Sequence, residues 1–329
     1  MKSTYRRKLL SAIAAAALTL AGAAAPAFAQ DTYPTKPIRV VVPYTPGGVS
    51  DTVTRLVMQK LAERLKGTII VDNQGGANGQ IGSSTVARSA PDGYTLLVVV
   101  AAHAINPSLY PKMTYSPLQD LRGVSEFGAI PLLMVSSAQL PPKNLKEFVA
   151  WAKANPQSAT FASSGAGSGA HLVGELFAQT TGIPMTHVPY KGIAPALPDL
   201  FAGQVAMIFD SVQTMMPQVK AGKLHALAMT SAKRWPAAPD VPTMAEAGYP
   251  GMTGGSWIGL LAPAKTPKEI VAKLSAETQK VLDMPEVREK LIEYGIDPVG
   301  GTPEQFDAFI QSEAKRWAEV VKKADIRLE

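Results

Sequence analysis

Residues 38–55, which read IRVVVPYTPGGVSDTVTR, constrain the fold of this chain more than any other stretch. They begin with a short β-branched apolar run, which predicts a strand buried on both faces. Two prolines end that run, and Gly47-Gly48 predicts a turn that residues with a Cβ could not follow. Ser50 or Asp51 is then the expected cap of a helix with one apolar face. The stretch therefore predicts a helix N-terminus whose free N–H groups favour an anion.

Most strand-to-helix connections bind nothing, so one such turn has a purely structural explanation as well. The same pattern, however, occurs a second time. Residues 159–163 predict a strand, 164–169 (SGAGSG) a glycine turn, and about 170–181 a helix. Two helix N-termini of this kind predict a cleft in which an anion is held from both sides.

The first 29 residues have the pattern of a secretory signal peptide. Four basic residues precede an alanine-rich apolar stretch at 9–25, and Ala27-Phe28-Ala29 fits a cleavage signal. We expect export to the periplasm with cleavage near Ala29; the alternative is a membrane anchor. The leader holds four of the 32 Lys and Arg and none of the 26 Asp and Glu, so the net charge falls from +6 to +2 without it. The basic balance is therefore weak support for a nucleic-acid partner, and none is expected.

The remaining length of about 300 residues exceeds one comfortable core, so two lobes are expected. The chain has no cysteine. This excludes disulfides, thiol catalysis and Cys-based metal sites.

Strands and helices alternate along the first third of the chain, which predicts an α/β fold with a parallel sheet. Strands are expected at 68–72 and 94–100, with a glycine-rich loop at 73–79 and a helix at 81–90 between them. Ligands of such sheets lie at the carboxyl ends of the strands. His103 and Asn106 follow the third strand and are expected at that edge.

Extended segments at 122–135 and 249–256 are the expected crossings between two lobes. Lobe one would comprise residues 30–127 and 257–329, and lobe two residues 128–256. Further helices and strands complete the prediction; Gly67 is the expected stop of the first helix and Thr302 the cap of the last. The helices are expected at 144–154, 268–282, 286–294 and 303–323, and the strands at 185–189, 205–209, 224–230 and 257–261.

An ordered set of motifs from about Tyr33 to the end resembles the Bug-type solute receptors, the periplasmic binding components of tripartite tricarboxylate transporters. The motifs are Tyr33-Pro34-x-Lys36-Pro37-Ile38-Arg39, Pro43-x-x-Pro46-Gly47-Gly48-x-x-Asp51, Pro91-Asp92-Gly93-Tyr94-Thr95-Leu96, Asn106-Pro107-x-Leu109-Tyr110, Gly167-Ser168-x-x-His171-Leu172, His187-Val188-Pro189-Tyr190-Lys191-Gly192 and Asp240-Val241-Pro242-Thr243-x-Ala245-Glu246-Ala247-Gly248.

The resemblance implies a two-lobe type II periplasmic-binding fold, the Venus flytrap, with the ligand cleft between the lobes. It also implies a small carboxylate ligand held largely by backbone amides and waters, no cofactor, and the membrane components of the transporter as partners. Loop 73–79 departs from the family: it reads NQGGANG where Asn-Arg-Pro-Gly-Ala-Gly-Gly is common.

Three other classes of site were weighed. Residues 165–170 fit the dinucleotide pattern G-x-G-x-x-A, but the next strand carries no acid for a ribose. Ser168 and His171 lie three apart, yet Ser168 lacks the flanking glycines of a nucleophile elbow and is better explained as a helix cap or ligand donor. The four histidines are too scattered for a zinc signature. A metal site or a hydrolase is therefore disfavoured.

The expected function is capture of a small organic carboxylate by a monomeric, non-enzymatic receptor. Dicarboxylates, tricarboxylates, aromatic acids and acidic amino acids all remain open as ligands. The alternatives are a periplasmic sensing subunit and a periplasmic enzyme that uses the same cleft. The candidate ligand-binding residues are Tyr44, Thr45, Pro46, Gly47, Gly48, Asp51, His103, Asn106, Ser163, Ser164, Gly165, Ser168, His171, Tyr190, Lys191 and Asp210.

Overall fold

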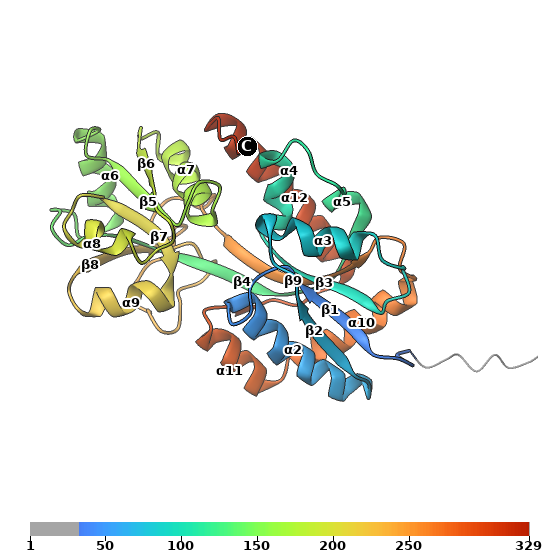
Figure 1. Ribbon diagram of the computed structural model, residues 1–329. Helices are drawn as coiled ribbons and strands as arrows, with labels where there is room; N and C mark the ends of the chain where they lie inside the picture. Colours follow the sequence, from blue (N-terminus) through green and yellow to red (C-terminus); the bar gives the residue numbers. More distant parts are fainter. Residues whose placement is uncertain (1–32, 329) are drawn as a thin grey trace, which may run out of the picture. The chain divides into compact units, whose positions relative to one another are not determined.

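The computed structural model describes residues 33–328 (Figure 1). The predicted signal peptide and its cleavage site therefore lie outside the described residues. The fold begins with three parallel strands in the order β2-β1-β3: β1 (Ile38–Val42), β2 (Ile69–Asn73) and β3 (Thr95–Val100). Between them lie α2 (Val49–Leu65), the short 3-10 turn η1 (Ala77–Gly79) and α3 (Gln80–Ala87). This is the predicted strand–loop–helix alternation.

Two long antiparallel strands continue the sheet. β9 (Gly255–Pro263) pairs with β3 on one side and with β4 (Leu121–Ser137) on the other. β10 (Asp297–Pro298) lies on the opposite edge of β4. The sheet as a whole is therefore mixed, and the parallel arrangement expected from the first third of the chain holds for β1, β2 and β3. The alternation pattern identifies the parallel units but does not detect the two long strands that join them.

The second half of β4 carries another group of strands. β7 (Met207–Ser211) and β8 (Leu224–Met229) both pair antiparallel with β4. β5 (Thr160–Ser163) lies parallel to β7 and to β6 (Thr186–Pro189). Around these strands the helices are α6 (Leu145–Ala154), α7 (Gly169–Thr181), α8 (Ala196–Phe201) and α9 (Val212–Lys220).

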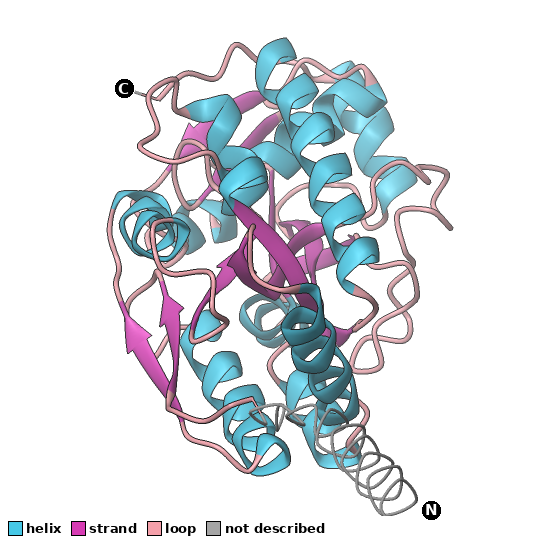
Figure 2. Cartoon of the chain, turned by 90° about the vertical axis from the view of Figure 1, so that its right-hand side faces the viewer, coloured by secondary structure: helices cyan, strands magenta, loops and turns pink. Residues whose placement is uncertain are grey.

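The remaining helices are α4 (Ala102–Leu109), α5 (Pro117–Asp120), α10 (Lys268–Leu282), α11 (Pro285–Glu293) and α12 (Pro303–Lys323). Helices lie on both sides of the strands (Figure 2). Trp257 of β9 packs edge-on against Phe306 and Phe309 of α12, and all three belong to, or pack against, one large apolar core. No helix among residues 33–328 is long and apolar enough to span a bilayer.

The helix ends test the local predictions. Thr302 caps α12 in a reciprocal capping box with Gln305, as expected. Two other expectations were wrong. Lys66, not Gly67, takes the left-handed conformation that ends α2. α2 begins at Gly48 with no side-chain cap, so neither Ser50 nor Asp51 occupies the capping position.

Residues 257–261, expected to rejoin the first part of the chain, lie in β9 beside β3. The proposed lobe boundaries at 127/128 and 256/257 fall within β4 and β9. β4 pairs with β7, β9 and β10, and β9 pairs with β3 and β4, so neither strand belongs to one proposed lobe alone. The division into lobes stays a prediction.

Candidate functional site

The first glycine loop (residues 44–48) connects β1 to the N-terminus of α2. Thr45, Pro46, Gly47 and Gly48 are all exposed. Gly47 has a φ of +82°, a conformation that disfavours any side chain, whereas Gly48 has a φ of −73°. The expectation that a side chain at Gly48 would strain the turn was therefore wrong, since the strained position is Gly47. The first-turn N–H groups of α2 have no intrahelical partner.

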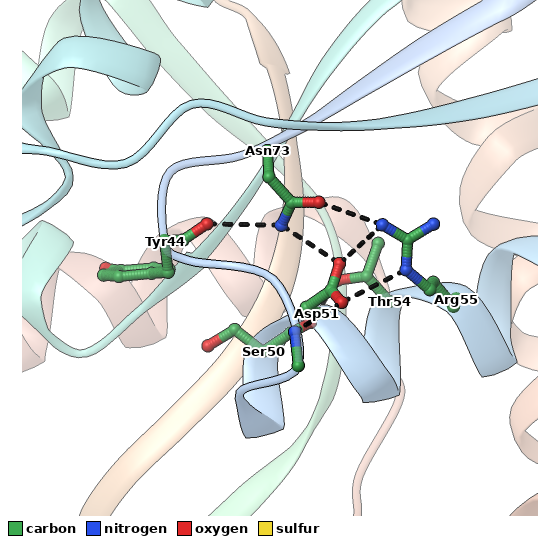
Figure 3. Close-up of polar contacts among 7 residues, drawn as sticks. Tyr44, Ser50, Asp51, Thr54, Arg55 and Asn73 are labelled. Carbon is green, nitrogen blue, oxygen red and sulfur yellow. Dashed lines mark hydrogen bonds and ion pairs between the residues drawn. The ribbon is translucent and has the colours of Figure 1, made fainter.

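Asp51, in the first turn of α2, holds the loop in place from within (Figure 3). Its carboxylate accepts hydrogen bonds from the Gly47 N–H at 2.9 Å, Arg55 Nε at 3.1 Å and Asn73 Nδ2 at 3.0 Å. Asn73 also donates to the Tyr44 carbonyl at 3.2 Å. Asp51 is only 4% exposed, so its oxygens are occupied by the protein and its contacts favour a positioning role over direct contact with a ligand.

The same contacts control the charge of Asp51. Burial alone would raise the pKa of its carboxyl, but the hydrogen bonds from Arg55, Gly47 and Asn73 outweigh burial, so the pKa lies below its ordinary value. The sequence did not reveal Arg55 and Asn73 as parts of this network. Arg55 is one helical turn after Asp51, a spacing at which ion pairs form, and that signal could have been used.

The second glycine loop (residues 73–79) lies against the first. Tyr44 directs its hydroxyl inward to the backbone of Val100, and burial raises the pKa of this phenol. A Cβ on Gly79 would lie 3.1 Å from that hydroxyl. The two loops line a cavity of about 460 Å³ with walls from Pro43, Tyr44, Thr45, Pro46, Asn73, Gly75, Gly76, Asn78 and Gly79.

α4 supports the second glycine loop through a pair of asparagines. Asn78 Nδ2 donates to Asn106 Oδ1 at 2.8 Å, and Asn106 Nδ2 donates to the Asn78 carbonyl at 3.0 Å. Asn106 is 2% exposed, so it too positions a loop. α4 itself was not predicted, because Pro107 lies inside it and proline disfavours the interior of a helix.

His103 also lies in α4 and is buried, with a hydrogen bond to the backbone of Pro117. Burial lowers its pKa to about 4. The ring lines a small cavity with Arg122 and Asp307, and no residue of the glycine loops contributes to that cavity.

The third glycine loop (residues 164–169) connects β5 to α7. Ser168 caps α7 by accepting a hydrogen bond from the His171 N–H at 3.3 Å. Ser163, fully buried, exchanges hydrogen bonds with the Gly165 backbone, at 3.0 Å as donor and 3.1 Å as acceptor. Ser164 is exposed. The cap predicted at Ser168 is thus present.

A stack of two imidazoles lies beneath this loop. The rings of His171 and His187 are 3.7 Å apart and nearly parallel, and His187 also stacks on Phe161. His187 Nε2 is 2.6 Å from Ser163 Oγ, and His171 Nδ1 accepts from the Gly167 N–H at 3.0 Å. Burial, and then the neighbouring His171, lowers the pKa of His187 to about 4. Sequence reasoning named His187 as one of four scattered histidines and as part of a family motif, but not as a partner of Ser163 or His171.

Gly167 brings the third loop to α4. A Cβ on this residue would lie 3.2 Å from Leu109 Cδ1 of α4 and 2.7 Å from Leu328 Cδ1. α4 therefore contacts the second glycine loop through Asn106 and the third through Leu109.

Of the remaining candidates, Tyr190 and Lys191 follow β6, and Asp210 lies in β7. The Tyr190 hydroxyl donates to Asp199 at 2.6 Å; burial and this carboxylate raise the pKa of Tyr190 to about 12. Lys191 is exposed. Asp210 accepts from the Ser211 N–H at 2.7 Å, and burial raises its pKa.

These groups suit binding better than catalysis. Ser168 is used as a cap and Ser163 is fully buried, so neither offers an accessible nucleophile. Among residues 33–328 no group of His, Cys, Asp or Glu could hold a metal ion. The exposed residues of the first and third loops include Thr45, Gly47, Gly48 and Ser164, whose backbone N–H groups and small hydroxyls suit an anion.

A sequence profile described as the tripartite tricarboxylate transporter family receptor matches residues 53–326. The chain belongs to this family. It is 39% identical over 313 residues to the protein BugT of Bordetella pertussis, which covers 94% of this chain and 96% of BugT. The ordered motifs thus indicated the family correctly.

Solved structures give the same result for the fold. An R. palustris protein solved with adipate matches with a TM-score of 0.74 and 37% identity over 90% of this chain and 100% of that chain. MatC from Rhodopseudomonas palustris, with bound malate, matches with a TM-score of 0.68 and 36% identity over 88% of this chain and 100% of that chain. The chain therefore has the two-lobe α/β fold of periplasmic binding proteins. Family and fold are those of periplasmic solute-binding receptors.

Proposed function

We propose that this protein captures a small organic carboxylate in the periplasm and delivers it to the membrane components of a tripartite tricarboxylate-type transporter. The proposal includes export with removal of residues 1–29, action as a monomer, and no catalysis. Relatives solved with adipate and malate support a carboxylate, and dicarboxylates are the first candidates.

The observation that carries the proposal is the pair of glycine-turned helix N-termini linked through α4. α2 begins at Gly48 and α7 after Ser168, and each presents first-turn N–H groups. α4 contacts the second loop, which shares a cavity with the first, and also contacts the third loop. A ligand with two carboxylates would have one amide-lined end for each.

Lobe one (residues 30–127 and 257–329) and lobe two (residues 128–256) would close over this ligand. The selectivity groups are then those exposed near the loops: Thr45, Ser164 and Lys191. Asp51, Asn106, Ser163 and His171 would act by holding the loops.

A thermal-shift screen tests the proposal, with dicarboxylates, tricarboxylates, aromatic acids and acidic amino acids as probes. The decisive variant is Gly48→Val. A Cβ on Gly48 meets only the Thr45 carbonyl oxygen at 3.7 Å, so the variant should fold normally. The valine side chain should nevertheless keep a carboxylate away from the α2 N-terminus and so abolish the rise in melting temperature that the ligand causes. A ligand at a hundred times its Kd stabilises by about 2.7 kcal/mol.

Gly251→Val is the matched control, since a Cβ there meets nothing within 4 Å and the residue is exposed. If Gly48→Val keeps the full ligand shift, the first glycine loop is only structural and the proposal fails. Product formation from any acid that binds would favour an enzyme. Binding without loss of labelled uptake in a deletion strain would favour a sensing subunit.

A further inference from the structure

A second cavity, of about 400 Å³, lies where β4, β9 and α12 meet (Figure 1). This volume is within the range of small-molecule sites. Its walls come from residues distant in sequence: Glu126, Ala129 and Pro131, Thr230 to Ala232, Thr253 to Trp257, Asp297 and Val299, and Phe309, Glu313 and Arg316. None of them belongs to a glycine loop.

Glu126 is the unusual group in this cavity. It is only 7% exposed, and within residues 33–328 its carboxyl has no hydrogen-bond or ion-pair partner. Buried carboxyls are normally paired, because desolvation without a partner is costly. Glu313, the other buried acid of the cavity, has partners: Arg316 at 2.9 Å and the Trp317 indole N–H at 3.0 Å. Burial, and then the charge of Glu313, raises the pKa of Glu126 to about 7.

The charged groups of the walls favour a cation. Glu126 from β4, Asp297 from β10 and Glu313 from α12 face a single guanidinium, that of Arg316. Arg316 is already engaged by Glu313 and by the Thr253 carbonyl at 2.7 Å. Within residues 33–328, the Glu126 carboxyl therefore has no positively charged hydrogen-bond donor as a partner.

The uncharged part of the walls is apolar and aromatic. Trp257 and Phe309 contribute rings 5.7 Å apart, and Ala129, Pro131 and Val299 add aliphatic surface. Aromatic faces attract cations as well as apolar groups. We propose that this cavity is a second binding site, specific for a small organic ammonium ion whose nitrogen bonds Glu126 and whose apolar body contacts Trp257 and Phe309. Its ligand class is thus opposite in charge to that of the glycine loops.

Calorimetric titration of the full chain with benzylammonium chloride tests this site, with neutral benzyl alcohol as the comparison ligand. We expect the amine to bind at pH 8 and the alcohol not to bind. Glu126→Gln should weaken amine binding at least about tenfold. Binding should also weaken roughly tenfold from pH 8 to pH 6, because Glu126 must be ionised to hold the ammonium group.

Glu319→Gln is the matched control: Glu319 is exposed on the same helix, α12, outside the cavity, and its loss should leave amine binding unchanged. Gly48→Val should bind the amine normally, which separates this site from the glycine loops. Circular dichroism establishes that Glu126→Gln is folded; if it is not, Glu126→Asp replaces it, and the shorter side chain should weaken binding. Equal affinity of wild type and Glu126→Gln, equal binding of the alcohol, or no amine binding at millimolar concentration would each overturn the proposal.

Discussion

The first and third glycine loops share one design but are held by different chemistry. Each follows a strand, turns at glycine and begins a helix. Beneath the first, a buried carboxylate collects hydrogen bonds from an arginine, an asparagine and a backbone N–H. Beneath the third, Ser163 and the stacked rings of His171 and His187 hold the loop, and the Glu175 carboxylate lies 3.6 Å from His171 Nε2. The first loop thus rests on an ion-paired carboxylate, and the third on a hydroxyl and two imidazoles.

The two supports should fail under different conditions. The first depends on Asp51 being ionised, and the third on His187 being neutral. Acid therefore weakens both supports, but it protonates His187 at a higher pH than Asp51. Two variants separate the two supports, and a third tests how the charge of the ligand is met.

Asp51→Ala should have the largest effect. It removes a buried acceptor and leaves the Gly47 N–H and Asn73 amide without their partner. We expect a loss of about 2–3 kcal/mol in unfolding free energy, and weaker carboxylate binding because the first glycine loop is released. Urea denaturation measures the first effect and calorimetry the second.

Glu293→Ala is the control for this prediction, because its ion pair with Lys290 is exposed and should contribute little to stability. A loss at Asp51 no larger than that of the control would mean that the network does not hold the loop. The lowered pKa of Asp51 also determines how stability depends on pH. The stabilisation from Asp51 is complete above the ordinary pKa of 3.8 and disappears as the pH falls through the lower pKa of the folded protein.

His187→Gln should change the pH dependence of stability. The pKa of His187 is 6.5 ordinarily and about 4 in the fold, so the unfolded chain takes up a proton that the folded protein resists. Its contribution is therefore complete above pH 6.5 and declines toward pH 4. We expect this decline to be roughly 1–2 kcal/mol for a partly screened ring. The stability of His187→Gln should lack the part of the decline between pH 6.5 and 4 that comes from the titration of His187.

Urea denaturation at several pH values makes the comparison, taken as wild type minus variant. This difference removes the contribution of His103, which also titrates low and is present in both proteins. If the unfolding free energies of the two proteins change in parallel between pH 6.5 and 4, the stability of the fold does not depend on a neutral His187.

Lys191→Met should have the smallest effect. Lys191 is exposed beside the third glycine loop, so amide donors are expected to carry the ligand's charge. Carboxylate binding should weaken by no more than about 1–2 kcal/mol, the scale of one charge-assisted hydrogen bond. A thermal shift that recovers at about tenfold to thirtyfold more ligand would match this. Lys146→Met, an exposed lysine on α6, is the control.

If no ligand concentration restores the shift in folded Lys191→Met, the lysine is the anchor. The third glycine loop would then bind by an ion pair, and the two loops would differ in how they recognise a ligand as well as in how they are supported.

Local sequence patterns predicted most elements of this fold. α10 and α12 were predicted to the residue, and Ser168 and Thr302 cap the helices where expected. These features depend on neighbours within a few residues, which is why sequence alone reveals them. The order of the sheet depends on β4 and β9, whose pairing joins residues far apart. The sequence predicted an extended crossing at 122–135 and a strand at 257–261 that rejoins the first part of the chain, but not that these two segments pair with each other.

Side-chain direction was the less predictable part of the site. Tyr44 follows a strand at the expected edge, yet its hydroxyl points inward to Val100. Asp51 and Asn106 lie in the expected motifs but bond to protein groups. His103 lines a different cavity. A motif fixes where the backbone of a residue lies, whereas the packing of distant segments decides what its side chain touches.

The length of β4 has a consequence for how this protein acquires its fold. Leu121 pairs with Pro263 at one end of the strand, and Ser137 pairs with Leu224 at the other. A chain interrupted before Gly255 would leave β3 and half of β4 as open sheet edges, and such edges promote association. Pairing across so many intervening residues is also slow. The chain must therefore extend as far as Pro263 before its central strand has partners along both halves.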